Sequence, residues 1–323
     1  MIRFLLFFLF ISCNVQDDFN NSLNQDSNSI WRVDLNKLKE GAPFPIVTSP
    51  SFKSVYEINK LSNDTKCLLV KINNEIRAYP YVYTNYSEVV NDTFLTHELA
   101  ISYCPQTKSG ICFNKEIKDF SGNLIASGYL FNDNLVLSDS KLNLFWSQML
   151  IEGIKGDAYY NDIDTFFAIE MSWEMIKRYF PSSKVYYRED ITVKILDVEN
   201  DEYYKKDDKY FGVINKDKSS NSVDLYSYSF FNKLKLDIKN INKKKAVIVG
   251  DNRIGYVVSF YVPDNFTFSL LDNDFPYVLI DDKGGKWDVF GFSSNGNVRL
   301  ESPSFFSAEL WAWKAFYEDI TYN

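Results

Sequence analysis

Residues 67–82 read CLLVKINNEIRAYPYV, with short apolar runs on both sides of Asn73 and Asn74. Apolar runs joined by two turn-forming residues are typical of two short strands with a tight turn. Residues 244–262, KKAVIVGDNRIGYVVSFYV, have the same pattern around the tripeptide GDN. The two stretches therefore predict strand-rich structure and an internal repeat.

The spacing along the chain suggests a register for this repeat. When Tyr79 is placed opposite Tyr256, Cys104 falls opposite Asp281 without a gap. Strand-like stretches follow in the same order on both sides of this alignment. We therefore predict two related strand-rich modules.

Each module is expected to close with an aromatic helix. Trp173, Ile176 and Phe180 recur at helical spacing, and apolar residues in 307–319 do the same. Periods this apolar indicate core tryptophans rather than a ligand stack. The predicted fold class is β-rich α+β, with two related strand-rich modules that each end in an aromatic helix.

Composition divides the chain into five predicted segments. The charge runs between the modules favour an irregular connector without a stable helix. The segments are a lipoprotein signal peptide (1–12), a disordered tether (13–30), a first module (31–195), the irregular connector (196–243) and a second module (244–323).

The N-terminus, MIRFLLFFLFISC, predicts the location of the protein. Arg3 precedes an apolar stretch of signal-peptide length, and Ser12 stands directly before Cys13. A small residue before a cysteine at this point resembles a bacterial lipobox, in which the cysteine is lipidated. We expect Cys13 to anchor the protein to a membrane of the cell envelope, facing the periplasm or the cell exterior. The alternative is a plain signal peptide cleaved near Ser12.

Charge and histidine content limit the partners. The chain has 323 residues, with 35 basic and 43 acidic side chains and a formal net charge of −8. This balance argues against binding nucleic acid through phosphates. His97 is the single histidine, so a zinc site of the usual histidine and cysteine ligands is not expected. We predict no cofactor and no metal.

Three motifs carry a family resemblance. They are NYSEVVND (85–92), YCPQTKSG (103–110) and NDNLVLSDSKLNLFWSQ (132–148). In this order and spacing they resemble the bacterial and archaeal family catalogued as domain of unknown function 3179, over most of residues 40–190. The resemblance implies no known activity.

Carried over residue by residue, the resemblance highlights Asn85, Glu88, Asn91, Asp92, Cys104, Pro105, Ser147 and Gln148. Two positions depart from the family pattern. Ser87 stands where many members have histidine, and Thr107 stands where they have the second cysteine of a C-P-L-C pair. A single cysteine can neither shuttle between dithiol and disulfide nor grip a metal alone.

Cys104 allows three interpretations. It ends a predicted strand at Pro105, and strand ends that lead into loops are common places for sites. It is a buried small hydrophobe, a nucleophile, or one half of a disulfide with Cys112. A nucleophile needs a base or a positive charge nearby, and the local sequence offers acids instead.

The motif NYSEVVND (85–92) also allows more than one interpretation. On a helical turn, Glu88 would share a face with Asn91 or Asp92, where the group could hold a cation or act as an acid with its orienting amide. Asn-Asp-Thr is also an ordinary turn and cap sequence. Ser147 and Gln148 have no base at a recognisable spacing, so we interpret them as buried hydrogen-bonding residues.

Two functions are consistent with these patterns. The first is a cell-envelope lipoprotein that binds a glycan, a peptide or another envelope protein through an aromatic and acidic cleft between the lobes. Its candidate binding residues are Asn85, Asn91, Ser147 and Gln148. The alternative is an envelope enzyme of hydrolase or transferase type that uses Cys104 with Glu88 and Asp92. A shared cavity for the Cys104 sulfur and a carboxylate would favour the enzyme.

Overall fold

The computed structural model describes most of the chain. The described residues are 31–41, 44–116, 122–141, 144–155, 163–190, 208–216, 222–295 and 298–323. The predicted signal peptide, the lipidation site at Cys13 and the tether 13–30 lie outside them.

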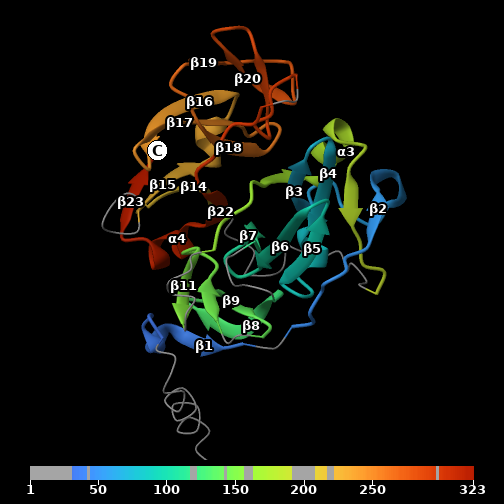
Figure 1. Cartoon of the computed structure of the whole chain (residues 1–323), viewed down its shortest axis with the longest axis vertical. Coiled ribbons are helices and arrows are strands. Elements are labelled where there is room, and N and C mark those ends of the chain that lie inside the picture. Colours follow the sequence, from blue (N-terminus) through green and yellow to red (C-terminus); the bar gives the residue numbers. More distant parts are fainter. Residues whose placement is uncertain are drawn as a thin grey trace, which may run out of the picture.

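Strands dominate the described residues, as the predicted β-rich α+β class requires (Figure 1). The first half of the chain contributes a sheet of order β12-β3-β4-β13-β2 and a meander of β5, β6 and β7. Their bounds are β2 (Phe52–Ser54), β3 (Lys66–Ile72), β4 (Glu75–Pro80), β5 (Val89–Phe94), β6 (His97–Cys104), β7 (Ser109–Asn114), β12 (Ile169–Ser172) and β13 (Lys184–Tyr186).

Short helices lie between the strands of this half. Helix α2 follows β4, and α3 joins β12 to β13. The bounds are η1 (Leu35–Lys37), η2 (Val55–Glu57), α2 (Tyr81–Thr84) and α3 (Trp173–Tyr179). Trp173 and Ile176 of α3 are buried, while Phe180 lies just past its last residue, and Pro181 follows, where it cannot continue the helix. We call β2–β7 with β12, α3 and β13 the N-terminal unit.

A further sheet lies between β7 and β12 in the chain and at the bottom of Figure 1. Its order is β1-β8-β9-β10-β11. The bounds are β1 (Leu38–Glu40), β8 (Leu124–Phe131), β9 (Asn134–Asp139), β10 (Phe145–Ser147) and β11 (Glu152–Lys155). We call β8–β11 the inserted sheet, because it separates strands that belong to the N-terminal unit.

The second half has sheets of order β22-β14-β15-β23, β16-β17-β18 and β19-β20-β21. We call β14–β18 with β22, α4 and β23 the C-terminal unit. The bounds are β14 (Lys209–Asn215), β15 (Ser222–Ser227), η4 (Tyr228–Phe231), β16 (Lys235–Ile241), β17 (Lys244–Asp251), β18 (Tyr256–Tyr261), β19 (Phe268–Leu270), β20 (Tyr277–Asp281), β21 (Lys286–Asp288), β22 (Phe305–Glu309), α4 (Leu310–Phe316) and β23 (Asp319–Tyr322).

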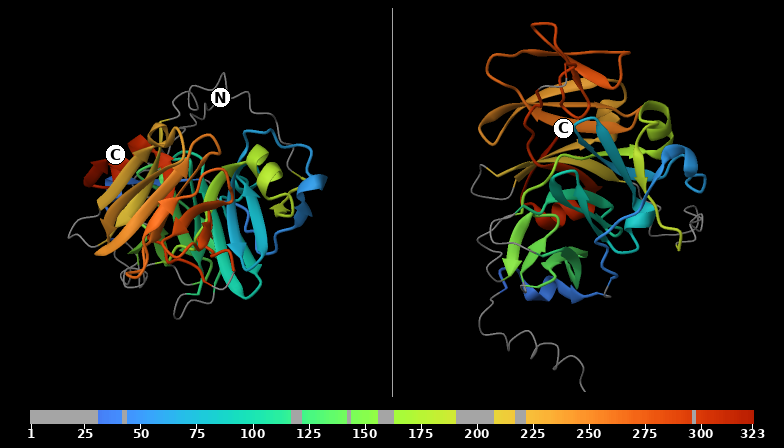
Figure 2. Two further views of the ribbon diagram at one scale, coloured as in Figure 1. Left: turned by 90° about the horizontal axis from the view of Figure 1, so that it is seen from above. Right: turned by 45° about the vertical axis from the view of Figure 1, so that its right-hand side comes forward.

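The two units have the same strand order and the same directions. In the N-terminal unit, β12 is antiparallel to β3, β3 and β4 form a hairpin, and β13 is parallel to β4. In the C-terminal unit, β22, β14, β15 and β23 repeat this arrangement. Helices α3 and α4 occupy the same place in each. The left view of Figure 2 shows the strands of both units side by side.

The register also matches. Residues 75–114 correspond to residues 222–261 without an insertion, because β4, β6 and β7 start and end at the same relative positions as β15, β17 and β18. The ladder of β5, β6 and β7 has the same pairs as that of β16, β17 and β18. The last pair, Cys104 with Ser109, therefore corresponds to Asp251 with Tyr256.

This register differs from the predicted one. Tyr79 lies in the sheet of β3 and β4, and the structure matches it with Tyr226 rather than with Tyr256. Asp281 lies in β20 and Cys104 in β6, in differently connected parts of the chain. Period-two apolar patterns make short hairpins look alike, so the sequence alone selected the wrong partner.

The expected irregular connector, 196–243, is also corrected. Its described residues include β14, β15, η4 and β16. Several strand residues here are buried, including Phe211, Val213 and Leu225. The charged sequence between β14 and β15 concealed the pairing of these strands, in which 210–215 pair with 222–227. Charge runs indicate solvated faces and loops, but they do not exclude flanking strands.

The units pack against each other rather than as separate bodies. Strand β12 lies against β18, and β22 lies against β7. The amide of Glu309, before α4, donates to the carbonyl oxygen of Thr107 in the β6–β7 turn at 2.9 Å. One apolar cluster contains residues of both units, among them Leu69 and Val249. Helix α4 therefore lies near the β6–β7 turn of the other unit.

Candidate functional site

The second and third sequence motifs meet at the β6–β7 turn, and Glu88 of the first lies near Cys104 there. A buried polar network there joins side chains from strands far apart in the chain. Its members are Ser102, Thr107, Ser109, Asn134 and Gln148. Strand alternation and the turn direct the first three side chains to one place, and the inserted sheet supplies the other two.

Gln148 is the hub of this network. Its amide nitrogen donates to Ser102 Oγ at 2.8 Å, and its amide oxygen accepts from Ser109 Oγ and Asn134 Nδ2, both at 2.8 Å. Its side chain is fully buried. A buried network whose members are all paired stabilises one arrangement of the core. Gln148 is a buried hydrogen-bonding residue, as its sequence context indicated.

Thr107 belongs to the same network. Its hydroxyl lies 2.8 Å from Ser109 Oγ and accepts from Asn134 Nδ2 at 2.9 Å. The position where many family members have a second cysteine is therefore taken here by a hydrogen-bonding hydroxyl. The side chain of Thr107 also interacts with the Cys104 sulfur.

Cys104 and Glu88 lie close to each other beside this network. Both are buried, at 1% and 5% exposure. Burial raises the pKa of the Cys104 thiol, and the nearby Glu88 carboxylate raises it further. Burial also raises the pKa of Glu88 to about 7. A protonated thiol is a poor nucleophile, so this environment does not activate Cys104.

Glu88 has an unusual local setting. Its backbone has a φ of +54°, and its Oε2 atom is buried without a hydrogen-bond partner. A carboxylate without a partner is costly in the interior, which is why the neutral acid is favoured. The hydroxyl of the adjacent Ser87 is also buried and unpartnered.

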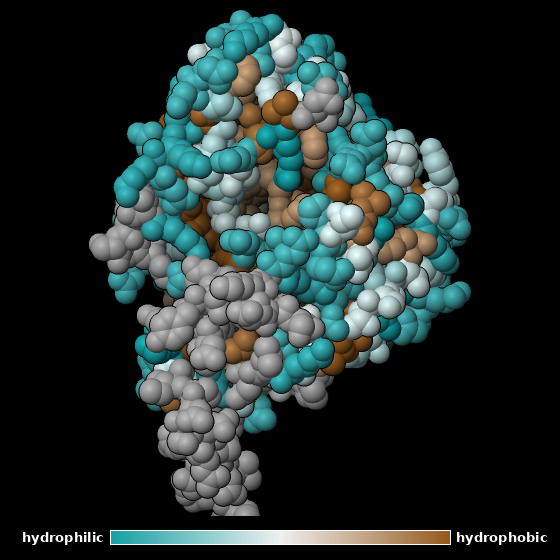
Figure 3. Space-filling view, in the orientation of Figure 1, coloured by the Kyte–Doolittle hydropathy of each residue, from teal (hydrophilic) through white to brown (hydrophobic). Residues whose placement is uncertain are grey.

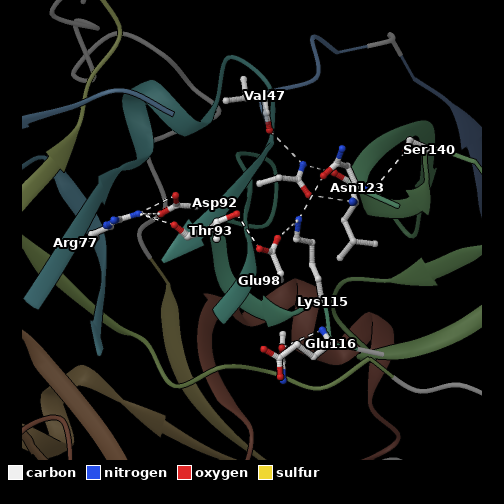
Figure 4. Close-up of polar contacts among 12 residues, drawn as sticks. Val47, Arg77, Asp92, Thr93, Glu98, Lys115, Glu116, Asn123 and Ser140 are labelled. Carbon is white, nitrogen blue, oxygen red and sulfur yellow. Dashed lines mark hydrogen bonds and ion pairs between the residues drawn. The ribbon is translucent and has the colours of Figure 1, made fainter. Parts of the chain in front are cut away.

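Asp92 lies elsewhere. Its carboxylate accepts hydrogen bonds from Arg77 Nη1 at 2.8 and 2.6 Å and from the Tyr79 hydroxyl at 2.5 Å. Figure 4 shows Arg77 and Asp92 facing each other; Arg77 belongs to β4 and Asp92 to β5, in different sheets. Asp92 influences the pKa of Cys112, whereas Glu88 influences that of Cys104. The structure thus brings together Cys104 and Glu88 but not Asp92.

The remaining highlighted residues have local roles. Asn91 is a buried clamp: its amide donates to the carbonyl oxygen of Leu124 at 2.8 Å and its oxygen accepts from the Leu124 amide at 3.0 Å. Ser147 is buried, and its hydroxyl accepts from the Leu150 amide at 3.3 Å. Asn85 is exposed at the end of α2.

The three cysteines in the described part of the chain are not bonded to each other. Cys67, Cys104 and Cys112 are free and buried, so the disulfide interpretation of Cys104 and Cys112 is wrong. The reason is strand geometry: Cys112 pairs with Ile101, three residues from Cys104, which places the two sulfurs on opposite faces of the sheet. Each belongs to a different apolar cluster.

A cleft lies at the equivalent turn of the C-terminal unit. A cavity of about 410 Å³ separates α3 from the β17–β18 turn and the loop before β20. Its walls combine charged side chains with aromatic rings. The charged residues are Arg178, Asp251, Arg253 and Asp272, and the rings belong to Tyr179, Tyr256, Phe275 and Tyr277. Figure 3 shows a recess between the upper and right-hand parts of this face, with apolar side chains on its walls.

An ion pair and contacts between aromatic rings form the inner wall of the cleft. Asp251 is buried, and Arg253 binds it through Nη2 at 2.5 Å and through Nε at 2.9 Å. The ring of Phe275 lies 4.5 Å from that of Tyr179 and 5.3 Å from that of Tyr256, measured between centroids. Through Phe275, the rings connect α3 of the N-terminal unit to Tyr256 in β18 of the C-terminal unit.

The sequence alone did not identify these cleft residues. An aromatic and acidic cleft between lobes was expected, but its position was not. Tyr179 and Arg178 in α3 and the loop 271–278 carried no recognisable motif. The correct repeat register would have drawn attention to Asp251, which stands in the place of Cys104.

The described part of the chain offers neither a metal site nor a membrane span of the helical kind. It contains no group of three or more histidine, cysteine or acidic side chains placed to hold a metal ion. Within the same residues, no helix has the length and apolar character to cross a membrane.

Comparison with known proteins identifies a family. The model of a family described as protein of unknown function (DUF3179) matches residues 42–320. No curated protein and no solved structure matches the chain.

Proposed function

Since the chain belongs to the DUF3179 family of unknown function, we propose a function from its geometry: it is a binding module of the cell envelope that holds a ligand in the cleft between α3 and the C-terminal unit. The observation that carries this proposal is the cavity of about 410 Å³ with charges of both signs and four aromatic rings on its walls. Concave sites with a few convergent polar groups are the usual form of small-ligand sites.

The side chains on the walls favour a single sugar unit of a glycan as the ligand. Ring faces such as Tyr179 and Tyr277 can pack against the apolar face of a sugar, while Asp272 and Arg178 offer acceptors and donors for hydroxyl groups. A protein partner would need a contact area far larger than this cavity offers. A peptide side chain is the alternative occupant.

The proposed location rests on the N-terminal sequence. Lipidation at Cys13 would tether the module to the membrane, and residues 13–30 would form the polar tether. Labelling with radioactive palmitate should mark the protein, and the label should be lost in Cys13→Ala. Unchanged labelling of that variant would overturn the anchor.

The matching registers support a further part of the proposal. We infer that the two units arose by duplication of one strand-rich element that ends in an aromatic helix. Tyr79 and Tyr226, at matching positions, both donate a hydroxyl to an aspartate on the adjoining strand, at 2.5 and 2.7 Å. The helices α3 and α4 close the two copies.

The enzyme alternative has less support. Its predicted residues Cys104 and Glu88 are buried, and Asp92 is engaged with Arg77 on the other face of the sheet. None of the three lines the cleft. A catalytic group has to reach its substrate, so this arrangement favours binding.

Saturation-transfer NMR with a panel of defined oligosaccharides and short peptides tests the cleft. In the double variant Arg178→Ala with Asp272→Asn, affinity should fall about tenfold, which is about 1.4 kcal/mol. Both side chains are exposed, so the fold should be retained. Lys177→Ala, on the same helix but outside the cleft wall, is the matched control. Equal binding by the double variant, or no binding by the unmodified protein, would overturn the proposal.

A further inference from the structure

A second cavity lies at the opposite end of β17 and β18 from the cleft. Its volume is about 590 Å³, and none of its wall residues belongs to the cleft between the units. The β16–β17 turn, the end of β18, β21 and residues 298–301 enclose it. We call it the distal cavity.

Arg299 lies in the wall of the distal cavity and is unusual for a charged residue. The centres of three phenylalanine rings lie 4.7 to 5.8 Å from its guanidinium carbon. These rings belong to Phe166, Phe167 and Phe292. The side chain also borders a smaller cavity of about 200 Å³. An aromatic cage holds the guanidinium plane in place and removes much of its hydration.

The hydrogen-bonding capacity of Arg299 is largely unused. A guanidinium has five N–H donors. Among the described residues, its side chain makes one hydrogen bond, from Nε to the carbonyl oxygen of Phe290 at 3.3 Å. Arg299 is half-buried, and it lines both the distal cavity and the smaller cavity.

No carboxylate within the described residues forms an ion pair with Arg299. Two acids near it, Asp288 and Glu301, are engaged elsewhere. Asp288 binds Lys71 at 2.5 Å and accepts from the amides of Phe290 and Phe292, and Glu301 binds Lys244 at 2.9 Å. Burial lowers the pKa of Arg299 to about 10, against the opposing attraction of Asp288. The guanidinium is still charged at neutral pH.

The charge of the wall is basic although the protein is acidic. Three lysines of the β16–β17 turn, Lys243, Lys244 and Lys245, join Arg299, against Asp264 and Glu301. Basic groups gathered in one concave surface of an otherwise acidic protein concentrate anions there. The rings of Tyr261, Phe266 and Trp287 form the apolar part of the same wall.

We propose that the distal cavity binds an organic ligand that carries an oxyanion, a carboxylate or a phosphate, on a ring-sized apolar body. The oxyanion accepts two hydrogen bonds from the terminal nitrogens of Arg299, and the body lies against Trp287 and Phe266. Arginine is suited to this pairing because its planar fork matches the geometry of two oxygens. The volume is in the range of small-molecule sites.

The test uses the intrinsic tryptophan fluorescence, to which Trp287 contributes, and the melting temperature. The probes are phenyl phosphate, benzoate, inorganic phosphate and neutral benzyl alcohol. Phenyl phosphate or benzoate should raise the melting temperature and change the fluorescence, because a ligand that binds only the folded state stabilises it. Benzyl alcohol should bind at least tenfold more weakly.

Variants separate the anion contact from general charge. Arg299→Leu should lose binding at least tenfold, and Arg299→Lys should recover only part of it. Arg299 is packed among rings, so its replacement can also disturb folding. A second variant therefore tests the cavity while leaving Arg299 in place. Lys244→Ala with Lys245→Ala changes exposed residues and should weaken binding about threefold, while exposed Lys314→Ala on α4 should have no effect.

Several outcomes would overturn this site. They are equal binding of benzyl alcohol and phenyl phosphate, unchanged binding by Arg299→Leu, or no binding of any probe at about 10 mM, a concentration at which even millimolar affinities are measurable. Loss of binding in the cleft variant Arg178→Ala with Asp272→Asn would place the probes in the other cavity. The two proposals therefore fail separately.

Discussion

The β6–β7 turn and the β17–β18 turn occupy the same position in the two units, yet their surroundings differ. At the first, the inserted sheet covers Cys104 and provides Asn134 and Gln148, so the turn is part of a buried polar network. At the second, the corresponding Asp251 is bound by Arg253 and forms a wall of the cleft. The same backbone thus supports a sealed core in one copy and a cavity in the other.

The difference comes from the strands that the chain builds after the meander of each unit. After β7 the chain builds β8–β11, and Gln148 reaches the turn from the end of β10. After β18 it builds β19–β21, and the loop 271–278 stands away from the turn behind Phe275. In the first copy, Gln148 pairs with the polar groups of the turn and excludes water from it. Among the described residues, the second copy has no side chain in this role.

Among the substitutions that test the difference between the two turns, Gln148→Ala should have the largest effect on the free energy of unfolding. It removes a fully buried side chain and leaves Ser102, Ser109 and Asn134 with lost partners, so we expect a loss of roughly 3 to 5 kcal/mol in the free energy of unfolding. Urea denaturation followed by circular dichroism measures it. Ser147→Ala, buried nearby with one long hydrogen bond, is the matched control and should cost about 1 kcal/mol. Equal costs for the two would show that the network is not the feature that seals the turn.

Glu88→Gln should change the pH dependence of stability. The Glu88 pKa is about 7 in the folded protein and 4.5 in a model compound. The unfolded state therefore releases the proton first, and stability falls as pH rises from about 4.5 to 7, then levels. Glu88→Gln lacks this penalty and should be about 3 kcal/mol more stable than the unmodified protein at pH 8, and similar at pH 4.

Urea denaturation at both pH values gives this difference directly. Exposed Glu318→Gln is the control and should follow the unmodified protein at each pH. If Glu88→Gln and the unmodified protein show parallel stability from pH 4 to pH 8, then Glu88 is not held in the environment described here.

Cys104→Ala should have the smallest effect. The thiol acts as a small buried hydrophobe, so its loss should cost about 1 kcal/mol and leave ligand binding in the cleft unchanged. In the native protein, iodoacetamide should fail to label Cys104, as mass spectrometry can measure. Rapid labelling under native conditions, together with loss of binding in Cys104→Ala, would instead place the function at the first turn.

Parts of this architecture were predictable from local pattern. The hairpin around Asn73 was predicted, and the turn has Asn73 at a φ of +52°, a conformation that asparagine tolerates. Helical spacing and a following proline act within a few residues, and the structure has a short helix, α3, at Trp173 and Ile176. Burial of Gln148 was also expected, since no base accompanies it.

Other parts were not predictable because they depend on partners distant in the chain. Asp92 was grouped with Glu88 as neighbours on a helical turn, but the segment is strand β5, and Asp92 meets Arg77 of β4, a strand of another sheet. The cleft residues come from α3 and from 251–278, and nothing local links them. The position of Arg299 among three rings is likewise a product of packing.

The sequence by itself determined the strand-rich class and the apolar faces of its elements, because these depend on residue spacing over a few turns or pleats. The tertiary structure alone decided which hairpins correspond, which turn is sealed and which is open. Those outcomes depend on the placement of β8–β11 and β19–β21, and contacts between segments so far apart leave no periodic signal in either segment.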